Sequence, residues 1–243
     1  MVDPPRADPG AAMLAASSLA ILLTDLLGRR ALPPARQWLA QALGDAESAD
    51  REAFLGAFTA TARRVGKSAL TLAPDEVARL GVLGVTWPVG GWGLDDLGRV
   101  TLLLRAAGRW PERELVALVE DCYRHGDNRE RGAVLRALSL LPSGERLLAI
   151  GIDACRTHIQ PLFEAIACEN PYPARHFPDL NFNQMVLKAL FTGVALARIV
   201  KLDQRVTPEL ARMASDYASE RRAAGRSVPA DIGRLTGAQG SEP

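Results

Sequence analysis

The sequence has few of the residues that mark catalytic or metal-binding proteins. Its 243 residues include three histidines and three cysteines, and aromatic side chains make up only 5%. Cys122, Cys155 and Cys168 show no CxxC spacing, so neither a zinc ribbon nor a disulfide framework is indicated, and a reducing compartment is favoured. The net charge of +1 gives no electrostatic reason to expect a nucleic-acid partner.

The sequence also lacks a convincing membrane segment. The apolar stretch at 11–27 is shorter than the ~20 residues that a bilayer requires, and Asp25 lies inside it. Residues 1–10 carry two aspartates against one arginine, so the positive start of a signal peptide is missing. We therefore expect a buried first helix or a dimer helix in a cytoplasmic protein, with peripheral membrane association left open.

Strand patterns are scarce as well, because Val and Ile are scattered singly while Ala and Leu dominate. Apolar residues instead recur with a period of about 3.6 residues, which is typical of helices packed on a core. The pattern predicts an all-α fold with helices near 11–28, 34–43, 50–66, 74–84, 94–107, 111–125, 128–141, 143–157, 160–169, 181–193 and 207–224.

The two ends of the chain are polar and rich in proline and glycine, which predicts a disordered N-terminus at 1–10 and a flexible tail at 229–243. Residues 11–228 are expected to form one domain with halves at 11–108 and 109–228. From residue 111 onward the helices are short and paired by tight connections. This favours an irregular HEAT- or armadillo-like α-solenoid of antiparallel helix pairs, although no clean repeat is present, and a compact irregular bundle is the alternative.

One predicted helix carries an unusual lysine. Between Asp179 and Arg198 the only charged residue is Lys188. Asn181, Gln184 and Lys188 are spaced i, i+3 and i+7, so they line one face of the helix as a polar stripe. Because a buried ammonium group is costly unless it is paired, the stripe must open on solvent or a cavity, or a carboxylate must reach Lys188.

The segment before this helix, 169–179, concentrates polar chemistry. Its prolines predict an extended or turning backbone that holds side chains at fixed positions. Its carboxylate, amide, phenol and imidazole groups suit acid–base work, a metal or a polar ligand, and come from Glu169, Asn170, Tyr172, His176 and Asp179. A metal set built on Cys155-x-x-His158 lacks a second matching pair, so no metal and no cofactor are predicted.

The last long helix, 207–224, places Asp216 and Glu220 one turn apart on the same face, which is unfavourable unless a cation lies between them. Arg212 on the same helix or Lys188 on the neighbouring helix would supply that cation. We expect Asp216 or Glu220, and after them Glu169, to pair with Lys188. We also expect 169–179, 183–188 and 216–222 to meet at one site, because short connections make sequential helices neighbours.

Four runs of sequence resemble one known family. They are YRHGDNRER at 123–131, CENPYPARHFP at 168–178, FNQMVLKALF at 182–191 and DYASERRAAGR at 216–226. Over roughly 110–230 the chain resembles the EboA family, the metabolite traffic proteins of the bacterial and algal ebo gene cluster. The resemblance implies a helical protein associated with processing or export of secondary-metabolite precursors. It offers motif positions and no established catalytic roles.

The expected function is to bind a metabolite or a protein of the same cluster during metabolite traffic. The alternatives are an enzyme that modifies the metabolite, with His176 as acid or base and Lys188 or Arg222 holding an anionic group, and a scaffold for the other cluster proteins. No catalytic residue is assigned. The candidate ligand- or partner-binding residues are Glu169, Asn170, Tyr172, His176, Asn183, Gln184, Lys188, Asp216, Tyr217, Glu220 and Arg222.

Overall fold

The computed structural model describes residues 9–237, and this range is helical, as the sequence predicts. Its only β-type pairing is an isolated antiparallel bridge between Ala69 and Gly93. The α-helices of the described range are α1 (Pro9–Arg30), α2 (Pro33–Glu47), α3 (Arg51–Val65), α4 (Pro74–Val82), α5 (Leu94–Ala107), α6 (Glu112–His125), α7 (Asn128–Ala137), α8 (Leu148–Arg156), α9 (Gln160–Ala167), α10 (Tyr172–His176), α11 (Asp179–Thr192), α12 (Pro208–Ala223) and α13 (Gly233–Thr236). The 3-10 helices are η1 (Gly144–Leu147), η2 (Leu196–Arg198), η3 (Leu202–Gln204) and η4 (Ala230–Ile232).

Several helices differ from the predicted ranges. The proline-rich segment 169–179 was expected to be extended or turning, but it contains the short helix α10. Pro173 occupies an early position of that helix, where its missing N–H costs nothing. The expected flexible tail is also wrong over 230–236, which form η4 and α13 with Ile232 and Leu235 buried. Residues 1–8 and 238–243 of the predicted ends lie outside the described residues.

The chain divides into two compact units, with the boundary between Ile150 and Gly151. The sequence-based boundary at 108/109 instead lies inside unit 1, between α5 and α6. These two helices contact each other, and α6 also contacts α7, which packs on α5. The helices α6 and α7 therefore share the core around α5, so unit 1 extends beyond the predicted boundary at 108/109.

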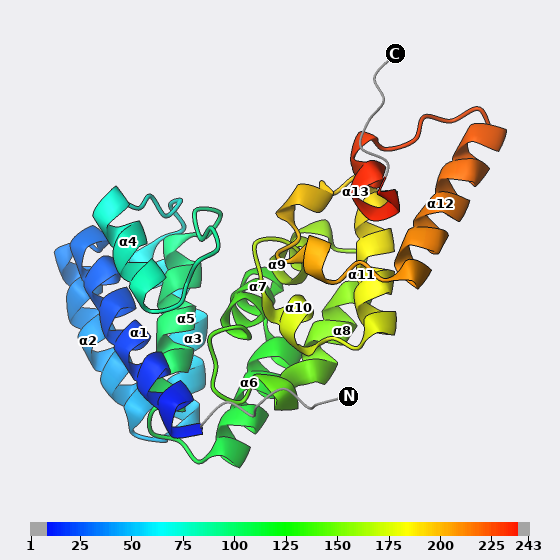
Figure 1. Ribbon diagram of the computed structural model, residues 1–243. Helices are drawn as coiled ribbons and strands as arrows, with labels where there is room; N and C mark the ends of the chain where they lie inside the picture. Colours follow the sequence, from blue (N-terminus) through cyan, green and yellow to red (C-terminus); the bar gives the residue numbers. More distant parts are fainter. Residues whose placement is uncertain (1–8, 238–243) are drawn as a thin grey trace. The chain divides into compact units, whose positions relative to one another are not determined.

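The central helix of unit 1 is α5, which packs against α1, α2, α3, α6 and α7 (Figure 1). Every residue of α5 except Arg105 is buried. A Cβ atom on Gly98 would lie 2.7 Å from the Cγ2 atom of Thr61, so glycine allows α3 and α5 to approach this closely. Burial on all sides explains why α5 is largely apolar around its whole circumference.

In unit 2, α11 contacts α9, α12 and η2 (Figure 1). The helix α12 buries only Leu210, Ala214 and Ala218, which form one stripe at i, i+4 and i+8. Thr207 caps its N-terminus, because its hydroxyl accepts a hydrogen bond from the Leu210 N–H at 3.1 Å. The remaining residues of α12 are half-buried or exposed.

Candidate functional site

A hollow in unit 2, which we name the α8–α11 pocket, gathers the polar stripe predicted on 181–193. Its volume is about 180 Å³. It is lined by the last turns of α8, by Phe177 after α10 and by one face of α11. The lining residues are Ile152, Cys155, Arg156, Phe177, Asn181, Gln184, Met185 and Lys188. Of the two alternatives for the stripe, opening on a cavity is therefore confirmed.

Lys188 lies in the wall of the pocket and caps the end of α8. Its ammonium group donates hydrogen bonds to the backbone oxygens of Cys155, at 2.7 Å, and of Thr157. The centre of the Phe163 ring lies 4.7 Å from Nζ. A helix C-terminus has unpaired carbonyls and a partial negative charge, so a cation is favourable there. Partial burial nevertheless lowers the pKa of Lys188, because water no longer fully solvates the ammonium.

The prediction of an acidic partner for Lys188 is wrong. Asp216 pairs with Arg212 at 2.7 Å on its own helix, and Glu169 pairs with Arg198. Within residues 13–237, no carboxylate lies at ion-pair distance from Lys188, and Glu220 is exposed. Neutral carbonyls and an aromatic ring stabilise the ammonium group without cancelling its charge.

The remaining polar groups of the pocket come from α8 and α11. Arg156, the last residue of α8, is exposed, and its guanidinium makes no hydrogen bond or ion pair with the described residues. The amides of Asn181 and Gln184 follow the stripe, whereas Phe177 and Met185 supply apolar surface. The pocket thus combines two cations and two amides with apolar walls, and no acidic side chain lines it.

Asn183 is buried, whereas its neighbour Gln184 is exposed, so the two side chains lie on different faces of α11. Its Nδ2 atom donates to the hydroxyl of Thr207 at 3.4 Å, while its Oδ1 atom has no partner among the described residues. Asn183 therefore belongs to the packing between α11 and the start of α12. It does not line the pocket.

Glu169 and Asn170 hold the chain between α9 and α10. Glu169 has a φ of +46°, a strained conformation for a non-glycine residue. Its carboxylate accepts two hydrogen bonds from Arg198, at 2.8 and 2.9 Å, and its N–H donates to the Arg198 carbonyl at 2.9 Å. The buried Asn170 side chain donates to the Ala165 carbonyl and accepts from the Tyr172 N–H. These contacts fix the backbone of the segment.

Tyr172 and His176 lie one turn apart on α10 with their ring centres 4.6 Å apart. Tyr172 is fully buried, and a Cβ atom on Gly151 would lie 2.9 Å from its ring and from that of Phe177. His176 is half-buried and is not among the residues that line the pocket. The α10 rings therefore pack beside Phe177 rather than presenting the imidazole in the pocket wall.

The α12 residues do not join the pocket, so the predicted meeting of all three segments is wrong for this helix. Tyr217 packs on Phe191 of α11 with ring centres 4.5 Å apart, while Asp216, Glu220 and Arg222 are exposed. Because α12 packs through the narrow stripe of Leu210, Ala214 and Ala218, its charged positions face outward. Of the predicted site residues, the pocket lining includes Gln184 and Lys188.

The three cysteines are free thiols, and burial raises the pKa of each to about 12. A thiol of this kind is protonated at neutral pH and is a poor nucleophile. Among the described side chains, no group of three or more His, Cys, Asp and Glu residues is placed to hold a metal ion.

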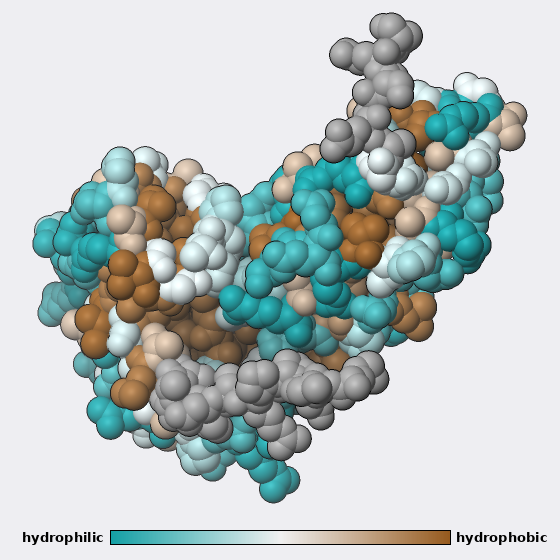
Figure 2. Space-filling view, in the orientation of Figure 1, coloured by the Kyte–Doolittle hydropathy of each residue, from teal (hydrophilic) through white to brown (hydrophobic). Residues whose placement is uncertain are grey.

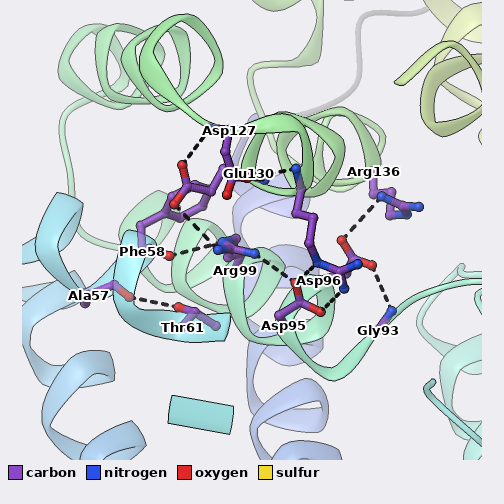
Figure 3. Close-up of polar contacts among 11 residues, drawn as sticks. Ala57, Phe58, Thr61, Gly93, Asp95, Asp96, Arg99, Asp127, Glu130 and Arg136 are labelled. Carbon is purple, nitrogen blue, oxygen red and sulfur yellow. Dashed lines mark hydrogen bonds and ion pairs between the residues drawn. The ribbon is translucent and has the colours of Figure 1, made fainter. Parts of the chain in front are cut away.

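Sequence reasoning missed a second polar cluster, which lies in unit 1 (Figure 3). Arg99 of α5 is 1% exposed and donates to the Asp95 carboxylate at 3.0 Å and to the Phe58 carbonyl at 3.1 Å. Its Nη2 atom lies 3.5 Å from Glu130 of α7. Arg129 also holds Asp95, with contacts of 2.7 and 2.5 Å.

Asp96 completes this cluster by accepting from the Gly93 N–H at 2.8 Å and by pairing with Arg136 at 3.3 Å. Burial raises the pKa of Asp96. Burial also opposes ionisation of Asp95, but the hydrogen bonds and charge of Arg129 outweigh it and lower the pKa of Asp95. The signal in the sequence was two acids and an arginine inside the apolar helix 94–107. We name Asp95, Asp96, Arg99, Arg129, Glu130 and Arg136 the α5–α7 cluster.

Comparison with protein families agrees with the resemblance seen in the sequence. The model of the family described as "Metabolite traffic protein EboA" matches residues 19–237. The chain belongs to the EboA family. The match extends into the first hundred residues of this EboA chain, beyond the stretch 110–230 that carries the resemblance, so the family spans both units. No curated protein and no solved structure matches the chain.

In the described part of the chain, no helix combines the length and the apolar character that a membrane span needs.

Proposed function

We propose that this EboA protein binds a small polar metabolite in the α8–α11 pocket and does not alter it chemically. The observation that carries the proposal is the pocket itself, a hollow of about 180 Å³ with charged, amide and apolar side chains in one lining. Binding sites for small molecules combine apolar walls with a few polar groups in this way. The family description as a metabolite traffic protein agrees with such a role.

The size of the pocket limits the ligand. A cavity of ~150 Å³ holds benzene, whereas pockets for drug-sized molecules measure ~300–1,000 Å³. At about 180 Å³, the pocket suits a single ring or a short chain with one or two polar groups. A nucleotide or a coenzyme would leave most of its surface outside.

The chemistry of the lining favours binding over catalysis. Its titratable side chains are Cys155, Arg156 and Lys188. The pKa of the Cys155 thiol is about 12, and an arginine does not exchange protons at neutral pH. A general acid or base works best with a pKa near the working pH, and His176 does not line the pocket. An enzyme that uses His176 is therefore the lower-ranked alternative.

Native mass spectrometry of the protein purified from cells tests the proposal. We expect a small co-purifying molecule in the wild type and its loss in Ile152→Trp, because Ile152 lines the pocket and a larger side chain would fill it. Ile159→Trp is the matched control, since Ile159 is exposed and lies outside the lining. A wild type without a bound molecule, or an unchanged molecule in Ile152→Trp, contradicts the proposal.

Incubation with the identified molecule separates binder from enzyme. We expect no product from the wild type, and weaker binding in His176→Gln because Phe177, which follows His176, lines the pocket. Product formed by the wild type and lost in His176→Gln, with fold and binding intact, would establish the enzyme instead.

A scaffold is the second candidate, because unit 1 exposes an apolar groove. Ile21 of α1 and Val82 of α4 are 63% and 87% exposed. They line a groove of about 320 Å³ together with Ser18, Leu22, Arg79 and Leu83. Figure 2 shows apolar surface over α1. Exposed apolar patches often mark protein interfaces. If the scaffold role holds, Ile21→Glu should abolish capture of a cluster protein that Ile159→Glu still captures.

The setting of this function is also a proposal. We propose a cytoplasmic protein, with peripheral membrane association left open, that acts with other ebo-cluster proteins in processing or export of secondary-metabolite precursors. The family description supports the traffic role. The stacking of antiparallel helix pairs as a HEAT- or armadillo-like solenoid remains a prediction from the short paired helices of the sequence.

A further inference from the structure

We propose that the ligand of the α8–α11 pocket is a small organic anion whose negative group lies between Arg156 and Lys188. This inference rests on the proposed function and narrows it to a class of ligand. The shared chemistry is an acidic group, carboxylate or phosphate, on a body small and apolar enough to lie against Phe177 and Met185.

The first argument is the charge of the lining. Arg156 and Lys188 both line the pocket, and the other six lining residues carry no acid. Lys188 is bound by carbonyl oxygens and a ring, all of which are neutral. Arg156 has no hydrogen-bond or ion-pair partner among the described residues. Two positive charges on one small pocket therefore lack a counter-ion within the described chain.

The second argument separates this arrangement from a helix cap. A basic residue in the last turn of a helix is ordinary, because it interacts favourably with the helix dipole. The carbonyl of Cys155, in the last turn of α8, and that of Thr157, just after it, are already paired, since Lys188 donates to both. Capping thus accounts for the position of Lys188. The guanidinium of Arg156, which lies in the last turn of α8 and lines the same hollow, is not needed to pair these two carbonyls and stays available to a ligand.

The third argument is the cost of leaving Lys188 uncompensated. Partial burial lowers the pKa of its ammonium, because the carbonyls and the ring replace water only in part. An anion in the pocket would supply the missing charge and would interact more strongly there than in bulk water. The amides of Asn181 and Gln184 lie on the same lining and can donate to such a group.

Benzoate, benzamide and phenyl phosphate are suitable probes, because a benzene ring suits the volume of the pocket. Dissociation constants would come from amide shifts in an NMR titration of the full chain. We expect benzoate to bind about tenfold more tightly than the neutral benzamide, as one favourable charge interaction allows. The ranking of benzoate against phenyl phosphate assigns the acidic group as carboxylate or phosphate.

Arg156→Gln is the deciding variant, because Arg156 is exposed and its loss should leave the fold intact. We expect weaker benzoate binding, by about tenfold, and unchanged benzamide binding. Arg222→Gln is the matched control, since Arg222 is exposed in the same unit, is unpaired among described residues and does not line the pocket. It should change neither affinity.

The outcomes distinguish this inference from the proposed function. Equal affinities for benzoate and benzamide would overturn the inference that the ligand is an anion, while the proposal of metabolite binding would stand. Benzoate binding unaffected by Arg156→Gln, or no shift with any probe, would also overturn this inference. The co-purifying molecule seen by native mass spectrometry tests the proposed function separately. If that molecule is neutral or cationic, the inference of an anionic ligand is refuted, and the proposal of metabolite binding stands.

Discussion

A buried arginine of unit 1 and a half-buried lysine of unit 2 have opposite surroundings. In unit 1 the α5–α7 cluster pairs three acids with three arginines, and the fully buried Arg99 contacts Asp95 and Glu130. In unit 2 Lys188 has only carbonyls and a ring as partners. The charges of the cluster cancel one another, whereas the lining of the pocket keeps two positive charges that can attract a ligand. The comparison therefore assigns a structural role to the cluster and a binding role to the pocket.

The largest expected effect is on Arg99, because removing one member of a buried ion pair leaves the other charge uncompensated. Arg99→Met should cost about 3–5 kcal/mol of unfolding free energy. All four tryptophans precede residue 151, so their fluorescence during urea unfolding reports on unit 1. Arg129→Met, whose side chain is 44% exposed, is the control and should cost less. A loss for Arg99→Met below ~1 kcal/mol would mean that the cluster is not a stabilising network.

Lys188→Met should have a smaller effect, because it removes hydrogen bonds and a costly charge together. We expect a loss of about 1 kcal/mol, the net value of a protein hydrogen bond. Amide hydrogen exchange in α8 and α11 measures the opening free energy of these helices. Lys201→Met, at an exposed lysine of unit 2, provides the baseline. A cost as large as that of Arg99→Met would show that the charge of Lys188 is compensated after all.

The pH dependence of ligand binding sharpens the same contrast. The pKa of Lys188 in the folded protein lies below its ordinary value of 10.5, so folded Lys188 loses its proton before unfolded Lys188 does. Between these two pKa values the unfolded chain binds more protons, and stability from this residue rises with pH. Benzoate affinity should fall over the same window, as the positive charge disappears. A benzoate titration repeated from pH 7 to pH 10.5 checks this, and Lys188→Met should not show the decrease.

The smallest effect is expected at Asp216, which was predicted to pair with Lys188. Its partner is Arg212, and both side chains are 60% exposed. Exposed ion pairs contribute little because water and salt screen them. Asp216→Asn should leave both the unfolding transition and benzoate binding of the wild type unchanged. A clear loss of stability or of benzoate binding would show that Asp216 contributes to the site after all.

Local features of the chain were readable without a structure. The spacing of Asn181, Gln184 and Lys188 predicted a polar stripe on one helix face, because positions i, i+3 and i+7 share a face on any α-helix, and this stripe lines the α8–α11 pocket. The order Thr207-Pro208-Glu209 is typical of a helix N-terminus, and Thr207 caps α12. The all-helical fold followed from the apolar period in the same way.

Only the tertiary structure decided which distant groups meet. The acceptors of Lys188 are backbone oxygens 33 and 31 positions away, and every residue carries such an oxygen, so no residue type marks them. The boundary at 150/151 and the buried turns at 230–236 depend on packing between segments far apart in sequence. Sequence determines what each helix face presents, because that is local geometry, whereas packing determines what each face meets.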